Sequence, residues 1–322
     1  MNFNEKIEQL RELISHSVKP LLSEKVIIAD APFTDNIGDI LIWQGTVDFL
    51  HENGFKILGI YGAGYFTFPK LDKDVTIILM GGGHFGDLWR MFHDIKMEII
   101  ARYPDNRIVM LPQSVCYQNE DLIQKDADLM ARHTDLHLFA RDQPSFDILS
   151  AHFARNHVYI APDLAFCIDS HRLAPYRNRE QGKTLFLLRG DKELPEDAPT
   201  VLQEADLTSD WPINKRFELT IRNFKRARRV LWDLKRYGIR SRFIDALICA
   251  AGNRLIRDYL TNTGCEFLEP FSRIVTTRLH PMILAVLLHK PVEYIDNTYG
   301  KLSAYAQTWL HDLPGVKPYG RD

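Results

Sequence analysis

The sequence predicts an α/β protein with two Rossmann-like domains, each built on a parallel sheet. Runs with the composition of strands alternate with runs of helical periodicity along its 322 residues, the pattern of units that lay parallel strands side by side. Several strand-like runs, such as residues 75–80, are apolar at nearly every position, as expected for strands buried on both faces of a sheet. The length exceeds that of one typical domain and suits two.

The first domain is predicted to hold six strands separated by helices. Its first helix, residues 1–22, repeats apolar side chains at helical spacing. Strands are expected at residues 25–30, 55–61, 75–80, 107–111, 136–140 and 157–160, and further helices at 40–52, 90–103, 121–133 and 143–154. Ligands bind beyond the carboxyl ends of such strands, so the loops expected at 36–39, 81–87, 112–114 and 141–142 should meet at one edge.

A polar stretch at residues 170–183 marks the expected boundary, which divides the chain into domains 1–175 and 176–322. The second domain is predicted to contain strands at 184–188, 274–277 and 291–295, and helices at 219–237, 244–260, 282–288 and 303–311. The segment 219–237 is rich in basic residues. It is either a solvated charged face or a surface that attracts an anionic lipid or polymer.

Charge and composition argue against several classes of protein. The net charge is −2, from 40 basic and 42 acidic residues, so nothing favours nucleic-acid binding. The N-terminus is polar and no apolar run approaches the ~20 residues of a membrane span, so a cytoplasmic protein is expected. The four cysteines are scattered and HExxH is absent, so we expect free thiols and no metal site.

The segment 277–281 carries the strongest functional signal. Its Arg278 and His280 stand where a predicted strand gives way to a predicted helix. The first N–H groups of a helix have no partner within it, and that end of the helix dipole is positive. A guanidinium and an imidazole added there favour a phosphate or carboxylate ligand. We therefore expect an enzyme that handles a small anionic donor.

Two further arginines follow predicted strands in the same way. Arg141 follows a strand of the first domain, and Arg189 follows the first strand of the second. Together with Arg278 they would clamp an anion across a cleft between the domains. An ion pair between Arg141 and the adjacent Asp142 is the structural alternative.

A glycine-rich segment at residues 81–87 is predicted to be a loop on the same edge. Gly82 and Gly83 would let backbone N–H groups approach a ligand closely. His84 and Asp87 stand beside them. A tight turn without a ligand is the alternative.

Carboxylates near other strand ends have two interpretations. Asn36 and Asp39 flank a glycine where the first strand leads into a helix, so they either cap that helix or contact a ligand, and both roles can coexist. Asp163 and Asp169 also follow a short strand. We interpret these two as parts of loop structure rather than as catalytic groups.

Taken in order, these motifs resemble those of the polysaccharide pyruvyl transferase family, in particular its exopolysaccharide-biosynthesis branch. The resemblance covers nearly the whole chain and runs through residues 36–39, 81–87, 111–114, 141–142, 162–163, 278–280 and 296–301. Two positions depart from the family pattern. Thr277 stands where members often carry Asp, and His84 stands where a neutral residue such as Asn is common.

The resemblance implies a fold like that of GT-B glycosyltransferases, with the active site in the interdomain cleft and a closing helix around Trp309 that crosses back to the first domain. It implies transfer of a pyruvyl group from phosphoenolpyruvate to two hydroxyls of a sugar or lipid-linked oligosaccharide. The products would be a cyclic ketal and phosphate, with no further cofactor. Peripheral contact with the membrane-bound polysaccharide assembly machinery, at the inner face of the membrane, belongs to the same expectation.

The resemblance and the donor's chemistry together suggest residue roles. In that family the Arg-Leu-His element binds the donor, so Arg278, Leu279 and His280 inherit this role. Phosphoenolpyruvate carries a carboxylate and a phosphate, so further donor contacts are expected from Arg141, Arg189, Gly82, Gly83 and Lys301. Proton transfer is expected from His280, Asp39 and Asp87. Acceptor contacts are expected from Asn36, His84 and Tyr299.

Two other functions remain compatible with the sequence. A GT-B glycosyltransferase that uses a nucleotide sugar would have the same architecture and would need a nucleotide pocket in the second domain. A non-catalytic scaffold or sensor of a polysaccharide assembly complex would tolerate loss of Arg278 and His280. Binding of phosphoenolpyruvate rather than UDP-sugars separates the transferases.

Overall fold

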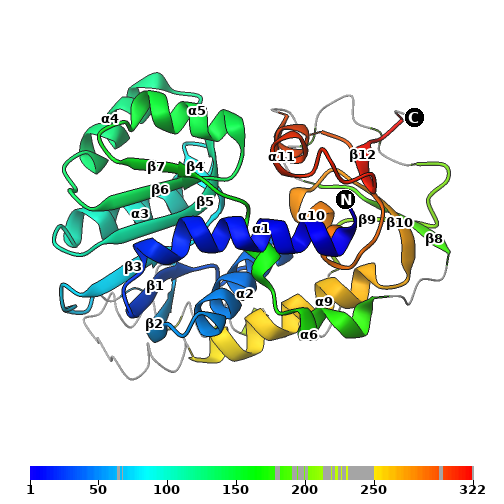
Figure 1. The fold of residues 1–322 in the computed structure, drawn as a ribbon, viewed down its shortest axis with the longest axis horizontal. Coiled ribbons are helices and arrows are strands. Elements are labelled where there is room, and N and C mark those ends of the chain that lie inside the picture. Colours follow the sequence, from blue (N-terminus) through cyan, green and yellow to red (C-terminus); the bar gives the residue numbers. More distant parts are fainter. Residues whose placement is uncertain are drawn as a thin grey trace.

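The computed structural model holds two parallel sheets at opposite ends of the molecule (Figure 1). It describes residues 1–63, 66, 68–177, 182–190, 194, 199, 202–212, 219, 222–223, 226, 230, 250–296 and 300–320. Every strand pairing in this part of the chain is parallel. The predicted α/β class with two parallel sheets is therefore confirmed.

The first sheet has the order β2-β1-β3-β5-β6-β7, with β4 paired to β5. Its strands are β1 (Lys25–Ala31), β2 (Lys56–Gly62), β3 (Val75–Leu79), β4 (Gly82–Gly86), β5 (Ile108–Cys116), β6 (Leu136–Ala140) and β7 (His157–Ile160). Its helices are α2 (Ile37–Glu52), α3 (Arg90–Arg102), α4 (Glu120–Met130) and α5 (Gln143–His152). Strand β3 is buried at every position, as its apolar sequence predicts.

The second sheet has the order β12-β11-β10-β8-β9. Its strands are β8 (Lys183–Leu187), β9 (Leu207–Ser209), β10 (Phe271–Thr276), β11 (Val292–Tyr294) and β12 (Val316–Pro318). The helices around it are α9 (Asp258–Leu268), which continues a π-helical turn (Gly252–Arg257), α10 (Leu279–Leu287) and α11 (Lys301–Trp309). Short helical turns η2 (Leu164–Cys167), α6 (Ser170–Leu173) and η3 (Ala174–Tyr176) precede β8 in the chain.

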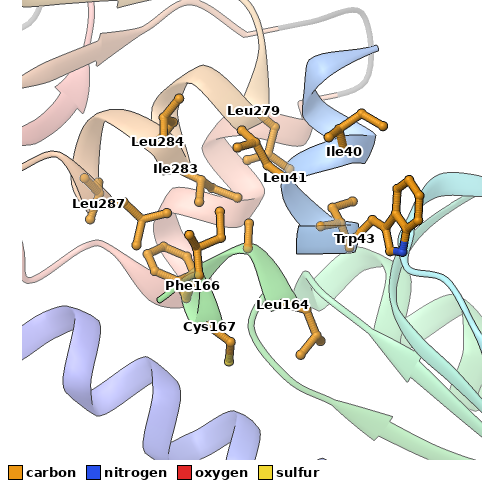
Figure 2. Close-up of a cluster of buried hydrophobic side chains, with 14 of the residues drawn as sticks. Ile40, Leu41, Trp43, Leu164, Phe166, Cys167, Leu279, Ile283, Leu284 and Leu287 are labelled. Carbon is orange, nitrogen blue, oxygen red and sulfur yellow. The ribbon is translucent and has the colours of Figure 1, made fainter. Parts of the chain in front are cut away.

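Helix α2 joins the two halves through one continuous hydrophobic core. Figure 2 shows Leu41 and Trp43 of α2 close to Leu164 of η2 and Leu279 of α10. A Cβ atom on Gly45 would lie 1.9 Å from the backbone oxygen of Leu164, so only glycine permits this contact between α2 and η2. Since the same core cluster reaches both sheets, apolar packing fixes how the halves sit against each other.

The two terminal helices also bridge the halves. Helix α1 (Phe3–Val18), which begins in an Asn2 capping box, crosses both halves in Figure 1 and contacts η2 and α10. Helix α11 packs on α5, and Trp309 Nε1 donates a 2.7 Å hydrogen bond to the backbone oxygen of Arg141. The closing helix thus reaches the first half, as the family resemblance implied. The division into domains 1–175 and 176–322 stays a prediction.

Two segments expected to be loops are strands. The glycine-rich segment forms β4, and residues 112–114 lie within β5, which runs five residues beyond its predicted end. Gly82 and Gly86 have φ values of +126° and +117°, and a Cβ on Gly81 would lie 2.6 Å from the Pro112 oxygen. The glycines therefore let two backbones approach closely, whereas the sequence suggested a loop that contacts a ligand or makes a tight turn.

Other elements differ from the predictions in smaller ways. Helix α2 begins at Ile37, so most of the expected 36–39 loop is the first helical turn. Strands β9 and β12, each of three residues, were not predicted. The predicted helix at 219–237 lies largely outside the described residues, whereas residues 250–260 of the helix predicted at 244–260 are described and are helical. Among the helices described, none has the length and apolar character needed to cross a membrane.

Candidate active site

His280 is in the first turn of α10 and faces the other half of the molecule. A Cβ atom on Gly38, in the first turn of α2, would lie 2.5 Å from His280 Nδ1. The imidazole therefore packs against α2 only because residue 38 has no side chain. On its other side, His280 Nε2 lies 3.4 Å from Asp163 Oδ2, a close ion-pair distance without hydrogen-bond geometry.

Asp163 is a completely buried carboxylate at the start of η2. It accepts a 2.9 Å hydrogen bond from Arg141 Nη1, and its own N–H donates to Tyr305 Oη. Burial alone would raise the pKa of Asp163, but His280 and Arg141 outweigh burial and lower that pKa to about 2. Asp163, which we interpreted from the sequence as part of loop structure, is thus the carboxylate that lies between His280 and Arg141.

Arg141 follows β6 and is held on several sides. Its Nε donates to Ser114 Oγ at 2.9 Å, and Ser114 Oγ in turn donates to Asp142 Oδ2 at 2.6 Å. Asp142 also caps α5 by accepting from Ser145 N. Arg141 therefore pairs with Asp163 and not directly with Asp142, which was the structural alternative. The hydroxyl of Ser114 links Arg141 to Asp142.

The start of β4 brings further predicted residues to the same place. A Cβ on Gly83 would lie 2.8 Å from Lys301 Nζ and 3.7 Å from Arg141 Nη2. A Cβ on Gly82 would lie 3.7 Å from Asp39 Oδ1. Two cationic groups from opposite halves and one carboxylate thus surround two adjacent glycines.

The Asn36–Asp39 segment both caps α2 and lines this region. Asn36 Oδ1 accepts from Gly38 N, and its Nδ2 donates to Asp39 Oδ2 at 2.9 Å. His84 Nε2 lies 3.7 Å from the same Asp39 oxygen, and its ring stacks on Phe92. Burial lowers the pKa of His84, although Asp39 acts in the opposite direction, so the imidazole is neutral at pH 7.

Arg278 has a different partner from the one its predicted role suggests. Its Nε and Nη2 donate to the two oxygens of Asp210 at 2.6 and 2.7 Å. Asp210 also accepts from Trp211 N at 2.7 Å. The buried Arg189 donates its N–H to Thr277 Oγ1, which places it beside the start of α10. Asp210 was missed because it lies far from any recognised motif.

Two predicted site residues, Leu279 and Asp87, have other contacts in the structure. The side chain of Leu279 lies in the hydrophobic core (Figure 2), so any donor contact falls to its backbone. Asp87 Oδ2 accepts from Gln118 N and Asn119 N, which fixes the loop after β5. Its catalytic role stays a prediction, and Tyr299 lies outside the described residues.

A small hollow, here called the Asp30 pocket, lies next to Asp39. It is lined by Asp30, Pro32, Thr34, Asp39, Ala63, Met80, Gly81, His84, Phe92 and Lys96. Lys96 Nζ pairs with Asp30 Oδ2 and donates to Met80 O at 2.7 Å. Sequence reasoning missed both charged residues, although Asp30 stands near the carboxyl end of β1, where ligand groups are expected. Within the described residues, no cluster of His, Cys, Asp or Glu has the composition of a metal site.

Comparison with known proteins identifies the family. The sequence profile described as polysaccharide pyruvyl transferase matches residues 36–299, which is most of the chain. The chain belongs to this family. The match spans the segments that carry Asn36, Asp163 and His280, so the clustered residues lie inside the family region.

Individual relatives agree with this assignment. The chain is 32% identical to "Putative pyruvyl transferase EpsO" of Bacillus subtilis, with 93% of this chain and 89% of the relative covered. It is 26% identical to "Pyruvyl transferase 1" of Schizosaccharomyces pombe, with coverage of 91% and 72%. The crystal structure of an uncharacterized protein from Klebsiella pneumoniae is similar in fold, with a TM-score of 0.59 and 20% identity over 95% of this chain and 97% of that one. The fold is GT-B-like, as predicted.

Proposed function

We propose that this chain transfers the pyruvyl unit of phosphoenolpyruvate to two hydroxyls of a sugar, giving a cyclic ketal and phosphate in the synthesis of an exopolysaccharide. The observation that supports this most is the convergence of Lys301 and Arg141 on Gly83, beside the His280–Asp163 pair. A small donor with two anionic groups needs cations from more than one direction, and this place offers them from both halves.

The donor would bind among these cations. Arg141 itself is tied to Asp163 and Ser114, so its Nη2 near Gly83 is the part directed to a ligand. Lys301 contributes a second positive charge at the same glycine. Arg278 and Arg189, at the start of α10, would hold the other anionic group of the donor, with Arg278 leaving Asp210 to do so.

The chemistry requires a proton to reach the enol carbon and two hydroxyl protons to leave the sugar. Of these two protons, one ends on the methyl carbon of the ketal and the other on the released phosphate. We assign His280 as the acid or base, because its Nε2 lies 3.4 Å from the buried carboxylate of Asp163, which would orient the imidazole. Asp39, which is close to Gly82, would take the proton from an acceptor hydroxyl.

The test is a transfer assay with the purified protein. Phosphoenolpyruvate is incubated with free and lipid-linked sugars, and phosphate release is followed together with a mass gain of one pyruvyl unit on the sugar. Thermal unfolding with phosphoenolpyruvate or UDP-sugars serves as the binding control. A rise in melting temperature with UDP-sugars alone would replace the proposal by a nucleotide-sugar glycosyltransferase.

The His280→Gln variant tests the assignment of the proton-transfer group. Glutamine keeps a similar size and hydrogen-bonding ends but cannot carry a proton between substrates. Turnover should fall by about 10²–10⁴-fold while donor binding is largely kept. Unchanged turnover would remove His280 from the proton transfer.

A further inference from the structure

Helix α11 brings a buried phenol from the second half of the molecule to the buried carboxylate of the first half. Tyr305 is fully buried, and its Oη accepts a 3.1 Å hydrogen bond from the backbone N–H of Asp163. Asp163 is fully buried as well. A backbone N–H in such a place needs an acceptor within the protein, because water does not reach it. Tyr305 supplies this acceptor from a position 142 residues later in the chain.

The backbone and the carboxylate of Asp163 are fixed together. Asp163 Oδ1 accepts from Ala165 N at 2.9 Å and so caps the short helical turn η2. Its Oδ2 accepts from Arg141 Nη1 at 2.9 Å and lies 3.4 Å from His280 Nε2. Where this carboxylate stands between Arg141 and His280 therefore depends on where the backbone of Asp163 lies. Tyr305 is the side chain that holds the N–H of that backbone.

A second contact from α11 fixes the backbone of Arg141. Its carbonyl oxygen accepts the 2.7 Å hydrogen bond from Trp309 Nε1, while its N–H donates to the Gln113 oxygen at 3.0 Å. One main-chain group of Arg141 is thus held by the neighbouring strand β5 and the other by α11. Lys301, the first residue of the same helix, has its Nζ beside Gly83. Both ends of α11 therefore reach the site.

The hydroxyl of Tyr305 acts by its geometry and not by exchanging a proton. Burial raises the pKa of Tyr305 well above its ordinary value, so the phenol is neutral at pH 7. The side chain has no exposed surface on which a substrate could rest. Its ring belongs to the hydrophobic core, and a phenylalanine ring would fill the same space. Only the oxygen is specific to tyrosine, and that oxygen holds Asp163.

We propose that Tyr305 and Trp309 are positioning residues, through which α11 of the second half holds Asp163 and Arg141 of the first half in the geometry that the reaction needs. The inference rests on the proposed function, because it concerns the groups that transfer protons and bind the donor. Without the hydroxyl of Tyr305, the N–H of Asp163 is left unpaired in the interior and the backbone shifts to find another acceptor. The carboxylate moves with that backbone and no longer meets His280 at the same distance.

The first experiment compares Tyr305→Phe with the wild type in the transfer assay, far below the unfolding temperature of both. Turnover per folded molecule should fall about tenfold to hundredfold, because misplacing a catalytic group by about 1 Å can cost roughly a hundredfold. The dissociation constant for phosphoenolpyruvate should stay within about twofold, because Ser114 and Trp309 still hold Arg141. A hydroxyl with a merely structural role would lower the free energy of unfolding and leave kcat at its wild-type value, and this result overturns the proposal.

The matched control is Tyr103→Phe. Tyr103 is also buried, and its Oη donates a 2.7 Å hydrogen bond to the backbone oxygen of Pro69, outside the site. This variant loses the same hydroxyl and one hydrogen bond with the backbone, so it reports what that loss does by itself. Its turnover should equal that of the wild type. An equal fall in the turnover of Tyr103→Phe and Tyr305→Phe would overturn the proposal.

Trp309→Phe tests the other anchor of α11. It removes the donor to the Arg141 oxygen and should weaken phosphoenolpyruvate binding about threefold to tenfold, the equivalent of one hydrogen bond. Calorimetric titration measures this change. Wild-type affinity in Trp309→Phe would overturn the proposal, and this arm decides alone if Tyr305→Phe does not fold.

A readout without substrate separates this proposal from the proposed function. The imidazole nitrogen signals of His280 are followed by NMR and assigned with the His280→Gln variant. They should move in Tyr305→Phe and stay in place in Tyr103→Phe. Unmoved signals in Tyr305→Phe overturn the positioning role even if the wild type turns over. Moved signals in a protein that releases no phosphate from phosphoenolpyruvate leave the positioning role standing and remove the transferase reaction.

Discussion

Arg141 and Arg278 share an expected role but sit in opposite environments. The Arg141 side chain is 1% exposed and pairs with Asp163, which is not exposed at all. The Arg278 side chain is 18% exposed and pairs with Asp210, which is 38% exposed. Both arginines lie just after a strand of a parallel sheet, so their sequence contexts are alike. Only the surrounding packing separates them.

The difference shows how one residue type serves two purposes in one site. A buried pair cannot lose one partner without leaving an uncompensated charge, so Arg141 is a fixed part of the structure. A partly exposed pair contributes little to stability and can exchange its carboxylate for that of a ligand. Arg278 is therefore the arginine whose contacts can change when the donor binds.

The largest expected effect comes from removing the buried arginine. Arg141→Met leaves Asp163 ionised and unpaired except for His280, so the free energy of unfolding should fall by about 3–5 kcal/mol. Urea unfolding measures this change. The double variant Arg141→Met/Asp163→Leu removes both charges and should regain a large part of the lost free energy of unfolding. An equal fall in the free energy of unfolding of the single and the double variant would contradict the role given to the pair.

Arg278→Ala should act on binding instead of stability. Loss of one charge-assisted donor contact should weaken phosphoenolpyruvate binding by about 2–5 kcal/mol, while the free energy of unfolding changes by less than ~1 kcal/mol. Calorimetric titration and urea unfolding measure the two quantities. The matched control is Arg273→Ala, which removes a similar pair with Glu293 on the same sheet. Near-native donor binding by Arg278→Ala would reject its assignment.

The buried pair should also give a specific dependence of stability on pH. The pKa of Asp163 is about 2 in the folded protein against an ordinary value of 3.8, so the unfolded chain takes up this proton first as the pH falls. The stabilisation is complete above pH 3.8 and is lost toward pH 2, by roughly 2 kcal/mol in all. The stability difference between wild type and Asp163→Asn should therefore stay constant from pH 7 to 5 and shrink below pH 4. A difference that shrinks already between pH 7 and 5 would contradict the low pKa.

The smallest effect is expected from removing the carboxylate that pairs with the partly exposed Arg278. Asp210→Asn removes the carboxylate that competes with the donor for Arg278. Phosphoenolpyruvate affinity should rise by about twofold to fivefold, the equivalent of one exposed ion pair. The same calorimetric titration measures it. A fall in affinity would mean that Asp210 orients Arg278 for the donor rather than competing with it.

The fold was largely predictable because its strands are apolar and long enough to show a pattern. The strands at 136–140 and 157–160 have the predicted bounds. The errors occur where glycine and proline stand inside strands, as in β4 and at Pro112, because these residues usually signal a turn. Those strands are possible because β4 and β5 approach closely, which is a tertiary contact that local sequence does not report.

The site was predictable by position but not by partner. Arg141, His280 and Lys301 follow or precede sheet strands, and the topology alone brings them to one place. Their partners come from elsewhere in the chain: Asp163 is 22 residues from Arg141, and Asp210 is 68 residues from Arg278. Lys96 is 66 residues from Asp30 and sits on a helix among ordinary charged residues. No local pattern marks such pairs before the chain is folded.

The unbroken core around α2 also limits how members of such a family can recombine. The glycines at 38 and 45 fit an imidazole and a backbone oxygen supplied by segments more than a hundred residues later in the chain. A chimera that joined the first sheet of one relative to the second sheet of another would have to inherit these matching surfaces as a set. Changes of acceptor are thus more readily reached by substitutions inside one half than by exchanging the halves.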